Sequence, residues 1–98
     1  MPWVTITKSG LKEKKLQAVF YDKDKKKVKT IHFGSAGMSD YTIHKDKERR
    51  QRYLDRHRKN ENWDDPQTAG ALSRWILWGD STSLNTNIAT FKKKFGYK

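Results

Sequence analysis

The sequence predicts a small single-domain α+β protein in which an N-terminal three-stranded antiparallel sheet is followed by three helices. Alternating β-branched and aromatic residues gather in the first third of the 98 positions. Strong helix formers fill the middle, and two amphipathic stretches fill the last third. The length allows one domain. We divide it into a basic β-hairpin region (1–34), a loop with an Arg-rich helix (35–62) and the apolar core helices (63–98).

The three strands are predicted from a period of two in the apolar residues. They cover 3–7, 16–21 and 28–33. The polar segment 22–27 is typical of an exposed turn, so the second and third strands form a hairpin. In the third strand Ile31 and Phe33 share one face and Val28 lies on the other, which leaves the buried face of this strand open.

The first helix is predicted over residues 46–58, a run with many charged helix formers and no β-branched residue. Asp46 is suited to cap its start. Tyr53 and Leu54 are its one convincing apolar pair, so we expect it to bury a narrow stripe and to display the rest.

The two C-terminal helices are predicted from their end signals. Asp65 and Pro66 are a typical N-cap and first position, and this helix would end at Gly79. The last helix would begin near Ser83 and end at Gly96. Its apolar stripe comprises Leu84, Ile88, Phe91 and Phe95. We expect these two helices to supply most of the core.

Composition narrows the classes of function. Lys and Arg number 22 against 11 Asp and Glu, a net charge of +11, and the isoelectric point is near 10.0. Such a balance favours a polyanion or an acidic protein surface as partner. With no cysteine, disulfides, Cys-ligated zinc and thiol nucleophiles are excluded. No apolar run approaches a membrane span, and the first residues lack a signal peptide's hydrophobic stretch.

Low aliphatic content raises the question of disorder. Leu, Ile, Val and Phe total only 18 residues, a fraction typical of disordered chains at this net charge. Twelve Trp, Tyr and Phe residues and the apolar C-terminal helices favour a folded core instead. Residues 1–62 carry +9 of the +11 charge, so the sequence predicts a folded domain that displays a basic surface.

Two basic features are the candidate binding residues. Arginines on the predicted middle helix recur every three or four positions and so share a face, where they could bind phosphate; a simply solvated helix is the alternative. The lysines around the hairpin turn could bind along a phosphate backbone. Alternatively, they only prevent edge-to-edge aggregation of exposed strands. The predicted polyanion-binding residues are Lys23, Lys25, Lys26, Lys27, Lys29, Arg49, Arg50, Arg52, Arg56, Arg58 and Lys59.

The histidines and tryptophans give weaker indications of function. His32, His44 and His57 could join nearby aspartates in a metal or general-base site, but no spacing is diagnostic. We therefore expect no catalytic residue, no metal and no cofactor, and a protein that is not an enzyme. The later tryptophans could stack on bases, but core packing is the better interpretation, with Trp63 the one partly exposed.

Ordered motifs across residues 28–96 resemble a known family. They are Ile31-His32-Phe33-Gly34, Gly37 to Asp46, Arg50, Tyr53, Arg56-His57, Glu61-Asn62-Trp63 and Thr68 to Trp78. Together they resemble a family of short basic uncharacterised proteins of nucleocytoplasmic large DNA viruses, the giant viruses of algae and amoebae. No activity is established for that family, so the resemblance implies a viral context and assigns no catalytic residue.

The expected function combines this context with the charge. We expect a non-enzymatic structural protein of a large DNA virus particle that binds DNA or another polyanion electrostatically, without sequence specificity. The alternative is a minor capsid (cement) protein that docks its basic faces on acidic surfaces of major capsid proteins. Either function would place the chain in the virion, and in the host cell cytoplasm or nucleus during assembly.

Overall fold

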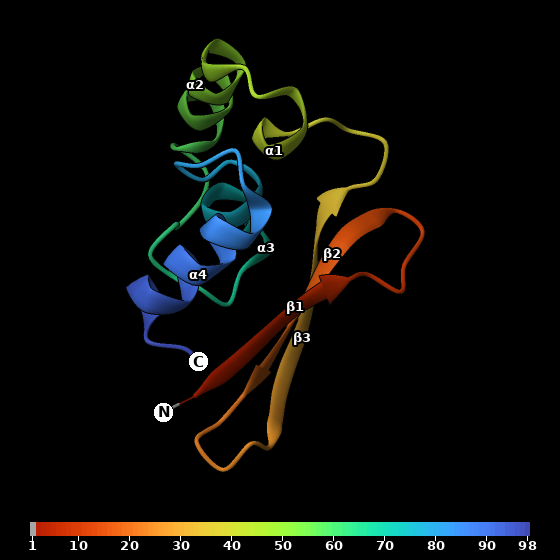
Figure 1. Cartoon of the computed structure of the whole chain (residues 1–98), viewed down its shortest axis with the longest axis vertical. Helices are drawn as coiled ribbons and strands as arrows, with labels where there is room; N and C mark the ends of the chain where they lie inside the picture. Colours follow the sequence, from red (N-terminus) through yellow and green to blue (C-terminus); the bar gives the residue numbers. More distant parts are fainter. Residues whose placement is uncertain (1) are drawn as a thin grey trace.

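The computed structural model describes residues 2–98 and has the predicted α+β architecture (Figure 1). Its elements in chain order are β1 (Trp3–Lys8), β2 (Lys14–Tyr21), β3 (Lys27–Ser35), α1 (Tyr41–His44), α2 (Lys47–His57), α3 (Ala69–Leu72), the π-helical turn η1 (Ser73–Leu77) and α4 (Leu84–Phe95). The strands form one antiparallel sheet in the order β1-β2-β3. The fold class is thus confirmed, and α1 is a short helix that the sequence analysis did not foresee.

The strand register settles which face of β3 is buried. Leu16 pairs with Phe33, and Ala18 pairs with Ile31, so the apolar residues of both strands lie on one face. Phe33 is fully buried, whereas Val28 on the other face is 57% exposed. The buried face of β3 is therefore the one that carries Ile31 and Phe33.

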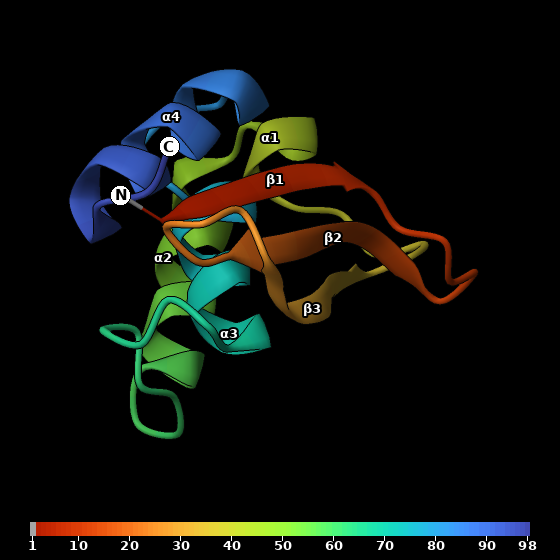
Figure 2. The same cartoon turned by 90° about the horizontal axis from the view of Figure 1, so that it is seen from below.

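The helices lie on one side of the sheet and close the core (Figures 1 and 2). The cluster of buried residues comprises Val4, Ala18, Phe20 and Phe33 from the strands, and Leu72, Ile76, Leu77 and Phe91 from the helices. Half of it comes from α3, η1 and α4, which confirms that the C-terminal helices supply much of the core. None of the helices within residues 2–98 is long and apolar enough to cross a membrane.

The first helix of region 63–98 is predicted to begin at Asp65-Pro66, and this prediction is wrong, since α3 begins at Ala69. Asp65 instead closes a turn, in which its Oδ1 accepts from the Gln67 N–H at 3.0 Å. Thr68 is the N-cap, and its hydroxyl accepts from the Ala71 N–H. The local hydrogen bonds of Asp65 therefore compete with helix formation for three residues, until Thr68 offers a better cap.

The predicted ends at Asp46, Ser83 and Gly96 are confirmed, whereas the helix predicted to stop at Gly79 ends at Leu77 in a π-helical turn, with Trp78 as its C-cap. Asp46 caps α2 by accepting from the N–H groups of Glu48 and Arg49. Ser83 caps α4, and Gly96 ends it in the left-handed conformation that favours glycine.

The two ends of the described chain lie side by side (Figure 1). The Val4 N–H donates to the Lys98 carbonyl at 3.1 Å, and the Lys98 N–H donates to the Pro2 carbonyl at 2.9 Å. Tyr97 packs its ring edge against Phe20. The last residues thus extend one edge of the sheet.

Candidate functional site

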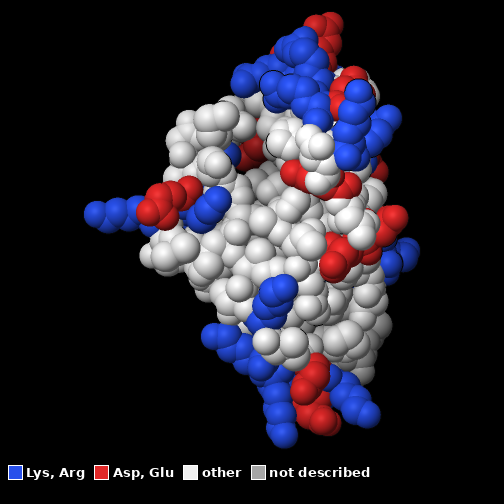
Figure 3. Space-filling view, turned by 180° about the vertical axis from the view of Figure 1, so that it is seen from behind, with Lys and Arg blue, Asp and Glu red and all other residues white. Residues whose placement is uncertain are grey.

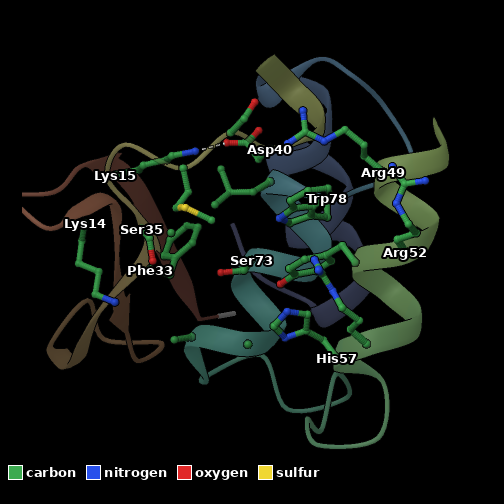
Figure 4. A pocket seen from close by; sticks show the side chains of 18 residues that line it. Lys14, Lys15, Phe33, Ser35, Asp40, Arg49, Arg52, His57, Ser73 and Trp78 are labelled. Carbon is green, nitrogen blue, oxygen red and sulfur yellow. Dashed lines mark hydrogen bonds and ion pairs between the residues drawn. The ribbon is translucent and has the colours of Figure 1, made fainter. Parts of the chain in front are cut away.

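A cleft of about 540 Å³ opens between α2 and the end of the β2–β3 hairpin that leads into α1. Figure 3 shows the hollow from outside, and Figure 4 shows Arg49 and Arg52 on one side with Lys14 and Lys15 on the other. The residues that line it are Lys14, Lys15, Phe33, Gly34, Ser35, Met38, Ser39, Asp40, Arg49, Arg52, Tyr53, Arg56, His57, Ala69, Gly70, Ser73, Leu77 and Trp78. Five of them are Lys or Arg, and one is acidic.

The α2 wall carries what we call the arginine row, Arg49, Arg52 and Arg56. Their spacing of three and four residues puts them on one helix face, about 5 Å apart along the axis. All three are exposed, and within residues 2–98 their side chains have no hydrogen-bond or ion-pair partner. The acids of α2, Glu48 and Asp55, do not line the cleft. The row is therefore free to bind an anion.

The opposite wall carries two lysines that the sequence analysis missed. The side chain of Lys14 has no hydrogen-bond or ion-pair partner within the described chain, and Lys15 Nζ binds Asp40 Oδ2 at 2.6 Å. Asp40 is only 2% exposed and also caps α1 by accepting from the Thr42 N–H. The one acid of the cleft is thus already paired, so an incoming anion meets little repulsion.

An aromatic column holds α2 in place beside the cleft. The ring of Tyr53 stacks on Trp78 at 4.2 Å and 2°, and on His57 at 4.2 Å and 27°. The ring of His44 lies 5.3 Å from that of Trp78. Burial raises the pKa of Tyr53, so its hydroxyl remains protonated at the cleft wall. The column fixes the arginine row relative to the C-terminal helices.

The structure separates Arg50 from the other predicted residues. Its Nε donates to the carbonyls of Trp78 and Gly79, and its Nη2 binds Asp80 at 2.8 Å. Arg50 therefore ties α2 to the segment after η1. Arg58 and Lys59 are exposed at the end of α2 and do not line the cleft.

The predicted lysines of the hairpin form a second basic region, which we call the lysine tip: Lys23, Lys25, Lys26, Lys27 and Lys29. All five are exposed. Asp22 organises the turn by accepting from the N–H groups of Asp24 and Lys26. Lys25 Nζ lies 4.8 Å from the ring of Trp3, in cation–π contact.

The lysine tip and the arginine row lie at opposite ends of a molecule 41 Å long (Figures 1 and 3). In the space-filling view, Lys and Arg side chains gather at both ends, and the surface between them is mostly uncharged. The structure therefore does not bring the two predicted basic features together.

The three histidines lie in separate environments. His32 Nδ1 bonds with the Ser9 hydroxyl, and His57 Nδ1 with Glu61. His44 Nδ1 accepts from the Asp46 N–H, and burial lowers the pKa of His44, which favours the neutral acceptor. Residues 2–98 contain no group of three or more His, Asp or Glu side chains placed to hold a metal ion.

The tryptophans of the last region pack as predicted. Trp75 and Trp78 lie against the core cluster. Trp63 is half-buried, and its Nε1 donates to Glu61. The guanidinium of Arg74 lies over the rings of Trp63 and Trp75, at 5.2 and 4.2 Å. These contacts engage the aromatic groups within the fold.

Comparison with known proteins gives one match. No curated protein and no solved structure matches the chain. Residues 4–57 match the model of a family of unknown function, DUF5754. The match covers the sheet, α1 and α2, and so includes every basic residue that lines the cleft. It spans more than half of the 98 residues, and the chain therefore belongs to the DUF5754 family.

Proposed function

We propose that this protein binds nucleic acid through its phosphates, with the cleft as the binding site. The observation that supports this most strongly is the convergence of the arginine row and Lys14 on one cavity. None of these four side chains has a partner within residues 2–98. These four side chains are unpaired and line the same cavity, so they are available to an anionic ligand.

Phosphate fits this arrangement better than a carboxylate-bearing protein surface does. Arginine offers a planar fork that pairs bidentately with phosphate and with carboxylate oxygens alike, so its chemistry alone does not distinguish the two. Three such forks on one helix face match a ligand with repeated charges. Base stacking on Tyr53 is blocked, because both faces of its ring are covered. Binding would therefore depend mainly on phosphates, without sequence specificity.

The setting that we propose is a large DNA virus particle, in which the protein would have a structural, non-enzymatic role. This part of the proposal depends on the sequence resemblance described above. A protein of the virion interior that neutralises packaged DNA needs basic surface and no cofactor, as the composition suggests.

Salt dependence of DNA binding tests the proposal. If the arginine row and Lys14 contact about four phosphates, log K should fall with log salt with a slope near −3 on a single strand. Fluorescence anisotropy of a labelled oligonucleotide would measure it. Absence of binding at about 50 mM salt would sink the proposal.

The lysine tip favours a second candidate, docking on an acidic capsid protein. It lies far from the cleft, and Val28 beside its lysines is 57% exposed. A concentrated group of exposed lysines is electrostatically complementary to an acidic protein surface. Nuclease-treated, DNA-free particles should retain the chain if this candidate is right and lose it if DNA alone holds it.

A further inference from the structure

We infer that the cleft holds a single nucleoside phosphate unit, with the phosphate on the arginine row and the nucleoside on the floor of the cleft. The inference rests on the proposed function, in that the same cations bind the phosphate. It goes further by assigning the ligand a size and a second, apolar half.

The floor of the cleft is apolar, which phosphate binding alone does not require. Phe33, Leu77 and Met38 line it beneath the charged walls. Phe33 and Leu77 are 0% and 4% exposed and belong to the core, so Met38, which is 66% exposed, is the one of the three that a ligand can touch. A large apolar side chain left exposed at the edge of a cationic cleft gains contacts when a flat apolar group enters. A nucleobase is such a group.

Hydroxyl groups lie between the floor and the cations. Ser35, Ser73 and Tyr53 all line the cleft. The Tyr53 hydroxyl has no hydrogen-bond partner among residues 2–98 and stays protonated, so it can donate to a sugar or phosphate oxygen. Cations, hydroxyls and an apolar floor within one cavity match the three parts of a nucleotide.

The size of the cleft limits the ligand. A volume of about 540 Å³ is in the range of cavities that hold one small molecule. A base-paired duplex is far too wide to enter and could meet only the exposed arginine row at the edge of the cleft. The floor is also closed tightly: a Cβ at Gly34, whose φ is +77°, would lie 2.6 Å from Leu77 Cδ1. The unit must therefore be a free nucleotide or one residue of a single strand.

Titration with three small probes tests the inference. Adenosine 5′-monophosphate, adenosine and inorganic phosphate would each be added to the full chain while backbone amide shifts are followed by NMR. The monophosphate should bind at least about tenfold more tightly than either part alone, with shifts at the cleft residues. Equal binding of monophosphate and inorganic phosphate would overturn the inference, because the apolar floor would then contribute nothing.

Two variants test the apolar half. Met38→Ser should weaken binding of the monophosphate about fivefold, since it removes apolar contact area. The control is Ile43→Ser, which removes a similarly exposed apolar residue of α1 that does not line the cleft. Both positions are exposed, so both variants should fold. Equal affinities of the two variants would contradict the assigned floor.

Oligonucleotides then identify the source of the unit. A single strand of about eight nucleotides that displaces the monophosphate assigns the cleft to strands, and a failure to displace it assigns the cleft to free nucleotides. Either result supports the inference. A duplex that binds as tightly as the single strand, unaffected by Met38→Ser, would overturn the inference and leave the proposed function. Binding of the monophosphate without binding of any nucleic acid would do the reverse.

Discussion

The cleft and the lysine tip carry the same number of basic residues but differ in geometry. The five of the cleft come from two elements and face one cavity. Those of the lysine tip come from one turn and the strand beside it, and all are exposed. Convergent charges can act on one ligand, whereas divergent charges raise only the general attraction for anions.

The supports of the two regions differ as well. The arginine row stands on a helix held by stacked aromatic rings, with Tyr53 at the centre. The lysine tip depends on the hydrogen bonds of Asp22 and on Lys25 over Trp3. A ligand meets a preorganised surface in one place and a solvated turn in the other. The comparison therefore indicates that charge count alone does not locate a binding site.

The largest expected effect is on the free energy of unfolding, when a residue that holds one of these two regions in place is removed. Tyr53→Ala removes the centre of the aromatic column and should lower the free energy of unfolding by about 3–5 kcal/mol. Trp3→Ala, at the other end, should cost less than half of that because Trp3 is only partly buried. Urea denaturation followed by circular dichroism measures both. Equal losses of unfolding free energy in the two variants would contradict the claim that the arginine row is held more firmly than the lysine tip.

The next effect concerns binding. Arg52→Ala/Arg56→Ala should weaken binding of a single-stranded oligonucleotide about 30-fold, since each charge-assisted contact contributes about 1 kcal/mol or more. Lys23→Ala/Lys26→Ala removes the same charge at the lysine tip and should weaken it less than about threefold. Anisotropy at constant salt compares the two. If the lysine pair costs more, the site lies at the tip.

A smaller effect tests the start of α3, the short helix whose Ala69 and Gly70 line the cleft. Thr68→Ala should lower the free energy of unfolding by about 1 kcal/mol, because the α3 N-cap is lost. Asp65→Ala should have a clearly smaller effect, since Asp65 only closes the preceding turn. Thermal unfolding distinguishes them. The reverse order would restore Asp65-Pro66 as the helix start.

The smallest effect is a pH dependence confined to the cleft end. Burial holds the pKa of His44 below its ordinary value of 6.5. As pH falls below that value, the unfolded chain takes up a proton that the folded chain resists, so stability should fall. The drop in melting temperature between about pH 7.5 and pH 5.5 should be smaller in His44→Asn. The lysine tip has no histidine and should not contribute.

Much of the fold could be predicted because its signals are local. The period of two in β2, the stripe from Leu84 to Phe95 and the cap at Asp46 each specify their element without long-range contacts. The start of α3 could not be predicted, because Asp65 and Thr68 are both good caps; in the structure Asp65 closes a turn with Gln67, and Thr68 caps the helix.

The site was predictable only in part. The spacing of Arg49, Arg52 and Arg56 predicts a shared face, and the structure places these three residues on the cleft wall. That Lys14 would face them depends on how the sheet docks on the helices, which no local pattern reveals. The diversion of Arg50 to the carbonyl of Gly79 is equally a result of tertiary packing.

The pairing of Lys98 with Pro2 and Val4 has a consequence for engineering. Since Lys98 lies beside Pro2 and Val4, a short linker could join residues 2 and 98 of this chain, and new ends could be opened at Gly10 in the exposed turn between β1 and β2. Such a circular permutant would keep every helix and strand. It would place both termini at the β1–β2 turn, on the lysine side of the cleft and not beside the arginine row, where a surface anchor or a fluorescent tag could be attached without touching α2.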